Sequence, residues 1–446
     1  MKTKLKLQNR LLLAALVAVT VLITACGGGT TTTTTTTCSL SQGTLGQTLG
    51  KSLSVGEVTS YTPVPINTVS GCTLSYSTFG ALPAGLSISS STGLVTGAPF
   101  TAGTYSTQLT VSTGSATSIG NSLFYTVVFT ITKPVTWSVQ AANTGLPAGP
   151  TSLTSVNGQL YALVAPLSGL NYVPQLWTST TQGVSWVNTN LTPPNPSGSL
   201  IGSGFVTDGN SIYLIGGQSS ASGVSPKTYA NSVYALTPGA SKPAWTTTTN
   251  LAFSGGGMAF MGTTFANNTL YVQGGFNSGN SISKKLYGSS NGGVTWIDII
   301  DTNNPQTANQ CLVATNDRLL SVGGVTTSAI PGAGFEPSPY VFTTSPPSFS
   351  WGKSTSGNIF LNSQNLKCAY LNAKVYTTGG IGSLSTATNA VYVSNDQGTS
   401  WVIEPSSANF SGRYGHGMAA QNGRLIVVGG VNSAGVGLSD SLVGTP

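Results

Sequence analysis

Hydrophobic positions fall into two regimes along the chain. Residues 11–25 form a continuous apolar run behind the basic segment 1–10. From residue 38 onward, apolar positions alternate with polar ones over short stretches that Gly, Pro, Ser and Asn divide. Strict alternation over four to eight residues predicts β-strands with one buried face. We therefore expect an all-β protein behind an N-terminal export segment.

The apolar run predicts a signal peptide over residues 1–25, because a membrane-spanning helix needs about 20 apolar residues. The run closes with Leu-Ile-Thr-Ala-Cys26, which resembles the lipobox of bacterial lipoproteins. The resemblance implies that Cys26 is lipidated and becomes the mature N-terminus, and that Gly27 behind it directs the protein to the outer membrane. The alternative is an ordinary signal peptide with a chance cysteine. Residues 26–37, rich in Gly and Thr, predict an extended tether.

Residues 38–133 predict an antiparallel β-sandwich. Three blocks, Leu-Pro-Ala-Gly-Leu-Ser-Ile (82–88), Ser-Thr-Gly-Leu-Val-Thr-Gly-Ala-Pro (91–99) and Ala-Gly-Thr-Tyr (102–105), follow one another there. In this order they resemble the putative-Ig domains of bacterial surface proteins, which are cadherin-like sandwiches. Cadherin relatives often bind calcium through several carboxylates, but this segment has only Glu57, so we expect a spacer without calcium.

From residue 134 to 446 the strand pattern repeats. Five strands end in a glycine pair and follow a turn sequence that favours a β-hairpin. The pairs are Gly216-Gly217, Gly274-Gly275, Gly323-Gly324, Gly379-Gly380 and Gly429-Gly430. A sixth strand, 160–165, lacks the glycines. A Trp recurs later in each repeat, at Trp186, Trp245, Trp296, Trp351 and Trp401, with gaps of 59, 51, 55 and 50 residues. This is the spacing of four-stranded propeller blades of kelch type.

The repeat count predicts how the ring closes. Six inner hairpins are followed by only five Trp-bearing outer strands, and Val135–Val139, which contains Trp137, supplies the missing one. Pairing this first strand with the last repeat hides an exposed sheet edge. The expected fold is all-β, an Ig-like sandwich followed by a six-bladed propeller that resembles the kelch repeat and the central domain of galactose oxidase.

Three turns before a Trp read Ser-x-x-x-Gly-x-Ser/Thr-Trp and resemble the Asp-box of sialidase-type propellers. Only one of them retains the aspartate, Asp396. The resemblance implies a structural turn on the face opposite an active site, so we expect Asp396 to bond backbone N–H groups. Sialidases also share a cluster of three arginines. Here Arg318 and Arg424 occupy one repeated hairpin position on separate blades and cannot converge with Arg413, which excludes a sialidase.

Charged residues make up 6% of the chain. The formal charge of +7 includes four basic residues of the export segment; without them 12 basic residues face 9 acidic ones, a balance of +3. No basic patch for nucleic acid is expected. The one histidine, His416, excludes both the two-histidine copper site of galactose oxidase and an ordinary imidazole metal site. Its context resembles the kelch Arg-x-x-His entry to an inner strand. We expect no metal and no cofactor.

A glycoside hydrolase could work with paired carboxylates alone. Asp298, Asp301 and Glu336 are the catalytic candidates, and Glu404 is a further acidic residue predicted on the open face. The alternative interpretation of these residues is solvated loop charge.

Four cysteines are disulfide candidates in an oxidising compartment. Cys38 and Cys72 lie in the sandwich. Cys311 and Cys368 stand 12 and 11 residues before their glycine pairs, which places them on inner strands of adjacent blades. They form either a disulfide or two buried thiols.

Long loops follow most glycine pairs and gather on the face where propellers usually bind ligands. Candidate ligand contacts in or beside these loops are the aromatic residues Tyr229, Phe276, Phe335, Phe410 and Tyr414. The alternative for each is local packing. We therefore expect a non-enzymatic, lipid-anchored binding or adhesion protein of the bacterial envelope, with a glycan or protein partner. A polysaccharide-acting hydrolase or lyase and a structural envelope protein are the alternatives.

Overall fold

The structure is a computed structural model. It describes residues 48–446 except 63–72, 115–121, 166–173, 192, 194–199, 220–226, 251–255, 327–339, 344–349, 355–362, 383 and 405–409. All regular secondary structure in this part of the chain is β-strand, as predicted. None of it is a helix that could cross a membrane. The predicted signal peptide and tether, with Cys26, Cys38 and Cys72, lie outside the described residues.

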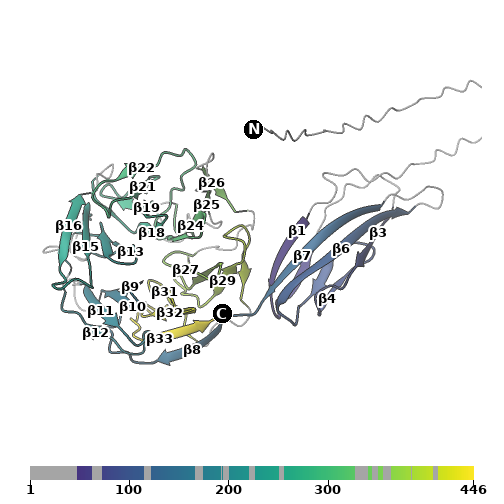
Figure 1. The fold of residues 1–446 in the computed structure, drawn as a ribbon, viewed down its shortest axis with the longest axis horizontal. Helices are drawn as coiled ribbons and strands as arrows, with labels where there is room; N and C mark the ends of the chain where they lie inside the picture. The colour runs from purple at the N-terminus through teal and green to yellow at the C-terminus, as the bar shows by residue number, and fades with distance from the viewer. Residues whose placement is uncertain are drawn as a thin grey trace, which may run out of the picture.

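The N-terminal domain consists of two β-sheets (Figure 1). One sheet has the order β1 (Thr48–Ser54), β7 (Ser122–Thr132), β6 (Gly103–Gly114), β3 (Thr73–Phe79), and the other β2 (Thr59–Tyr61), β5 (Val95–Gly97), β4 (Leu86–Ile88). Buried and exposed positions alternate along β7, so its inner face carries the core. The expectation of a wholly antiparallel sandwich is wrong at one edge, where β1 runs parallel to β7.

Six four-stranded sheets follow one another around a ring in the C-terminal domain (Figure 1). Blade one is β9 (Thr151–Val156), β10 (Gln159–Val164), β11 (Gln175–Ser179) and β12 (Val187–Asn188); blade two is β13 (Gly204–Thr207), β14 (Ile212–Ile215), β15 (Ser232–Leu236) and β16 (Trp245–Asn250). Blade three is β18 (Gly262–Ala266), β19 (Thr269–Gln273), β21 (Leu286–Ser289) and β22 (Ile297–Asp298); blade four is β23 (Cys311–Ala314), β24 (Arg318–Val322), β25 (Tyr340–Thr343) and β26 (Ser350–Lys353). Blade five is β27 (Lys367–Leu371), β28 (Lys374–Thr378), β29 (Val391–Ser394) and β30 (Val402–Ile403); blade six is β31 (Gly417–Gln421), β32 (Arg424–Val428), β33 (Ser441–Thr445) and β8 (Thr136–Ala141). A short pair, β17 (Met258–Ala259) and β20 (Phe276–Asn277), precedes and follows the inner hairpin of blade three.

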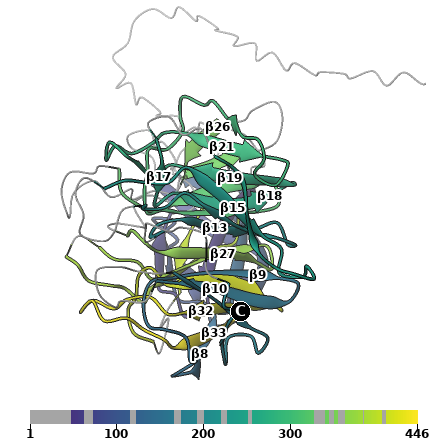
Figure 2. The same cartoon turned by 90° about the vertical axis from the view of Figure 1, so that its left-hand side faces the viewer.

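The innermost strands β9, β13, β18, β23, β27 and β31 contact one another in turn, and β31 also contacts β9. The predicted pairing of the strand at Trp137 with the last repeat is confirmed, because β8 pairs antiparallel with β33. Trp137 is buried, and its ring packs edge-on against Phe410 with centroids 5.4 Å apart. Figure 2 shows the propeller from the side, with its sheets stacked in layers.

Each glycine pair joins its blade to the following one. Both glycines of every pair have a positive φ, and a Cβ on the first would clash with the loop that enters the next blade. The second glycine donates its N–H to that loop: Gly217 to Met258 (2.8 Å), Gly275 to Thr307 (2.8 Å), Gly324 to Ser363 (2.9 Å), Gly380 to Arg413 (2.9 Å) and Gly430 to Gly149 (2.9 Å). In blade one, which lacks the pair, Ala165 donates to Pro150 of its own blade.

Candidate functional site

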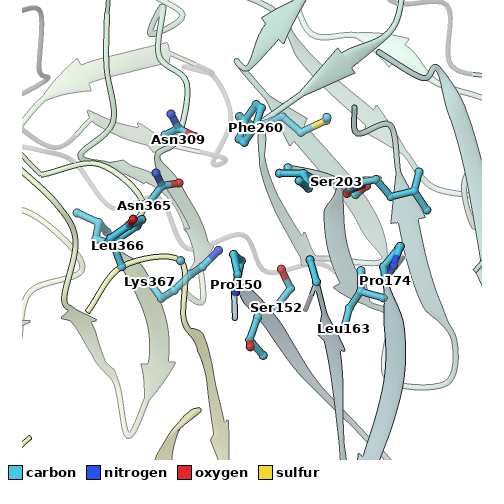
Figure 3. A pocket seen from close by; sticks show the side chains of 18 of the residues that line it. Pro150, Ser152, Leu163, Pro174, Ser203, Phe260, Asn309, Asn365, Leu366 and Lys367 are labelled. Atoms are coloured by element: carbon cyan, nitrogen blue, oxygen red, sulfur yellow. Dashed lines mark hydrogen bonds between the residues drawn. The ribbon is translucent and has the colours of Figure 1, made fainter. Parts of the chain in front are cut away.

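A cavity of about 270 Å³ lies at the propeller axis, where the six innermost strands begin (Figure 3). Every blade contributes to its wall through the loop that leads into its inner strand. The contributing segments are 150–152, 200–203, 260–261, 309–310, 365–367 and 414–415. The cavity opens on the same end of the blades as the glycine-pair loops, the face that we expected to bind ligands.

Backbone hydrogen bonds join the six entry loops in a chain around the axis, which we call the axial collar. Its members are Gly202, Phe260, Asn309, Asn365, Gly415 and Thr151. Going round the axis, Phe260 donates to Gly202 (2.6 Å), Asn309 to Phe260 (2.9 Å), Asn365 to Asn309 (2.8 Å), Gly415 to Asn365 (3.0 Å) and Thr151 to Gly415 (2.8 Å). The collar holds the cavity wall in place and uses up these five N–H groups.

Phe260 is strained within the collar. Five collar residues have φ between +57° and +71°, a conformation that Gly and Asn tolerate. Phe260 adopts it at +60° although a bulky side chain disfavours it. Its ring lines the cavity and packs edge-on against Phe276, with centroids 6.1 Å apart. Such strain concentrates at functional sites.

Lys367 is the one charged side chain among the described residues that line the cavity. It is the first residue of β27 and reaches toward Pro150, between Asn365 and Ser203 (Figure 3). Within the described part of the chain its ammonium group has no hydrogen-bond or ion-pair partner. Burial lowers the pKa of Lys367, and no neighbouring carboxylate opposes this effect.

Two carboxamides in the wall have unused acceptors. Gln310, which is 6% exposed, donates from Nε2 to the backbone oxygen (2.8 Å) and Oε1 (2.7 Å) of Gln273. Asn309 donates from Nδ2 to Oε1 of Gln364 at 3.0 Å. The side-chain oxygens of Gln310 and Asn309 have no partner in the structure. Both oxygens are also buried from solvent, so the open cavity does not reach them.

A second cavity of about 120 Å³ continues along the axis below the first. Both cavities are lined by Lys367 and Gln310, so these residues stand where the two meet. Cys311 and Cys368 line the lower one and form a disulfide with Cα atoms 6.0 Å apart. Of the two interpretations of this pair, the disulfide is therefore the one observed.

The five aromatic candidates lie in different environments in the structure. Tyr414 lines the cavity. Phe276 does not line the cavity and packs against the ring of Phe260, which does. Tyr229 and Phe410 are each 8% exposed and are packing residues rather than ligand contacts, Phe410 lying between Trp137 and Arg413. Phe335 is outside the described residues.

The carboxylates proposed for acid–base catalysis are engaged elsewhere. Asp298 forms an ion pair with Lys285 on an outer strand. Asp301 accepts the backbone N–H of Trp351 at 2.7 Å and that of Asn303 at 2.9 Å. Neither of them lines the axial cavity.

Two further acidic candidates also fail to supply a pair. Glu336 lies outside the described residues, so the separation of Asp301 and Glu336 stays untested. Glu404 is 3% exposed and accepts the backbone N–H of Val135 at 3.0 Å, so it does not lie on the open face as expected.

Asp396 is a turn residue, as predicted. Its Oδ1 accepts the N–H of Ser400 at 2.8 Å, and the indole N–H of Trp401 donates to Gly398 O at 3.1 Å. Thr181 and Asn291 occupy the same position in two other turns and accept the equivalent N–H groups. The turn joins the ends of β29 and β30 remote from the cavity.

His416 is fully buried and serves the repeat structure. Its Nε2 lies 2.8 Å from the hydroxyl of Thr378. Burial, then the charges of Arg413 and Lys367, hold the pKa of His416 well below 6.5, so it is neutral. Within the described residues no three His, Cys, Asp or Glu side chains gather as a metal site.

The sequence contained a signal for Lys367 that our expectations missed. Register aligns Lys367 with Gly204, Gly262 and Gly417, each directly opposite the last strand residue before a glycine pair. Lysine therefore stands at a repeat position that three other blades fill with glycine and the remaining two with Thr151 and Cys311. Phe260, Gln310 and the asparagines carry no comparable pattern.

Comparison with known proteins addresses the two domains separately. Residues 31–140 match the family model described as a putative Ig domain. The solved structure of YjhT, a kelch-type propeller protein, superposes with a TM-score of 0.55 at 15% identity, covering 69% of this chain and 97% of YjhT. At this identity the similarity shows the fold alone. No curated protein sequence matches the chain.

Proposed function

We propose that this protein is a non-enzymatic binding lipoprotein of the bacterial surface, and that the axial cavity of its propeller is the recognition site. The observation that carries the proposal is the convergence of all six entry loops on one cavity, in which Lys367 has no partner among the described residues. Clefts that combine apolar walls with a few convergent polar groups are the usual form of a ligand site.

A glycan is the ligand class that this wall favours. Phe260 offers an aromatic surface, and Asn309, Gln310 and Ser203 offer amide and hydroxyl groups beside it. The volume of about 270 Å³ lies just below the roughly 300–1,000 Å³ of pockets that enclose drug-sized ligands. The cavity therefore suits one sugar unit, with the rest of a glycan outside among the loops.

Anchoring follows from the N-terminal sequence. Lipid attached to Cys26 would hold the protein on the membrane, the Gly/Thr tether would separate the domains from the lipid, and the Ig-like domain would act as a spacer. Replacing Cys26 by Ala is expected to abolish incorporation of labelled fatty acid and to release the protein from the membrane fraction. Unchanged labelling in this variant would contradict the lipoprotein assignment.

Recognition is tested with the purified mature chain on a glycan array and in parallel on a panel of chromogenic glycosides. We expect array binding without turnover. Phe260→Asn, which keeps a residue that tolerates positive φ, should lose the binding, whereas Asp396→Asn at the opposite end should retain it. Turnover of a glycoside without array binding would instead favour a hydrolase. No signal in either assay or in protein pull-downs would favour a structural envelope protein.

A further inference from the structure

Lys367 is isolated from all acidic groups that the structure describes. Eight of the nine acidic residues of the chain lie in the described part, and none of the eight lines the cavity. The nearest buried cation, Arg413, already has its own counter-charge, because it makes two hydrogen bonds of 2.8 Å to Asp440. The neighbouring His416 is neutral and supplies no anion.

Lys367 is partly exposed in the cavity, and burial lowers its pKa. Its ammonium group has therefore lost part of its hydration, at a cost that no partner among the described residues offsets. An incoming anion removes this cost, and its interaction is strengthened by the low local dielectric. A purely structural role for Lys367 is disfavoured, because three other blades have glycine at the equivalent position and form the same fold.

We infer that the axial cavity binds a single sugar acid of hexuronate size, with the ammonium group of Lys367 as the counter-charge of its carboxylate. This inference rests on the proposed function. Ser152 and Ser203 line the same cavity, and their hydroxyl groups can accept hydrogen bonds from the hydroxyls of such a ligand. The ring of the sugar has the face of Phe260 beside it.

A carboxylate fits this wall better than a phosphate or sulfate group. Sites for those anions use several converging backbone N–H groups or a guanidinium fork. Here the N–H groups of Phe260, Asn309 and Asn365 are bonded to neighbouring collar carbonyls. One point charge in a wall that also holds the hydroxyl groups of Ser152 and Ser203 suits a singly charged, hydroxylated ligand.

The inference is tested by calorimetry with galacturonate and glucuronate against their neutral counterparts galactose and glucose. For the unmodified mature chain we expect the acid to bind at least tenfold more tightly than the neutral sugar. Lys367→Met should weaken hexuronate binding about 10- to 100-fold, the range for a hydrogen bond to a charged group. The ratio of hexuronate affinity to neutral-sugar affinity should fall toward one in this variant. Lys367→Arg, which keeps the charge, should retain part of the affinity.

The outcomes separate this inference from the proposed function. Equal binding of acid and neutral sugar, or hexuronate binding that survives Lys367→Met, overturns the role of Lys367 while glycan recognition stands. Preference for inorganic phosphate or sulfate over hexuronate overturns the carboxylate assignment. No binding of any hexuronate also overturns the inference, and the glycan array then decides independently whether recognition itself fails.

Discussion

The carboxylate of Glu404 accepts a hydrogen bond from the backbone N–H of Val135 at 3.0 Å, although 269 residues separate them. Val135 lies in the segment that links the two domains, and Glu404 follows the outermost strand of blade five. β1 of the sandwich contacts that same strand, β30. Burial raises the pKa of Glu404 to about 7, opposed by the hydrogen bond from Val135 and the charge of Lys374 and aided by Glu57 of the sandwich.

This raised pKa predicts that stability falls as pH rises from 4.5 toward 7. Between these values the folded protein holds a proton on Glu404 that the unfolded chain has released, so deprotonation favours unfolding. The loss is complete above pH 7 and amounts to about 3 kcal/mol. Denaturant unfolding at pH 5 and 8 measures it. Glu404→Gln, whose amide oxygen can still accept the N–H of Val135, should flatten the profile; an unchanged slope would contradict the assignment.

Breaking the ion pair of Arg413 and Asp440 should destabilise the propeller strongly. Arg413 is 0% exposed and also donates to Gly429 O at 3.0 Å. Arg413→Met leaves the carboxylate without its partner and is expected to cost about 3–5 kcal/mol in the free energy of unfolding. The double variant Arg413→Met, Asp440→Asn should recover part of this loss. Strictly additive losses would show that the two side chains do not interact.

Removing the disulfide should lower stability and disturb the cavity. Cys311 and Cys368 are 57 residues apart in sequence and join blades four and five. The double Ser variant is expected to lose roughly 2–4 kcal/mol, mainly because the unfolded chain gains freedom. Because Lys367 precedes Cys368, weaker hexuronate binding should accompany the loss. Equal melting temperatures with and without reductant would oppose this prediction.

Asp396 should contribute to stability and not to ligand binding. Asp396→Ala removes the acceptor for the N–H of Ser400 and is expected to cost about 1 kcal/mol. Asp396→Asn is the matched control, since Asn291 makes the equivalent bond in blade three. Thermal unfolding and the glycan array measure the two effects separately. A binding defect in either variant would place function on the unexpected face.

The collar should be sensitive to backbone conformation at Asn365, where φ is +57°. Asn365→Ala removes the short polar side chain that lets Asn adopt the left-handed region more readily than other residues with a Cβ, and is expected to cost about 1–2 kcal/mol. Asn365→Gly should be nearly neutral, because glycine adopts this conformation freely. Unfolding curves of the two variants give the comparison. If both lose the same stability, the side chain rather than the backbone matters at this position.

Much of the architecture was determined by the sequence alone. The glycine pairs and the Trp spacing predicted the blades, and the strand count predicted the partner of the strand at Trp137. The turn role of Asp396 was also predictable. These features depend on hairpins and turns, whose partners lie a few residues apart, and repetition reinforces each local signal.

The tertiary structure decided the site. Lys367, Phe260 and Gln310 come from three blades, and only the closure of the ring brings their entry loops together at the axis. The same is true of Glu404, which meets Val135 beside the neighbouring blade six rather than facing solvent. Burial and charge at these residues depend on neighbours more than 40 positions away in sequence. Local patterns carry no information about such contacts, so the fold was predictable from the chain and the chemistry of its cavity was not.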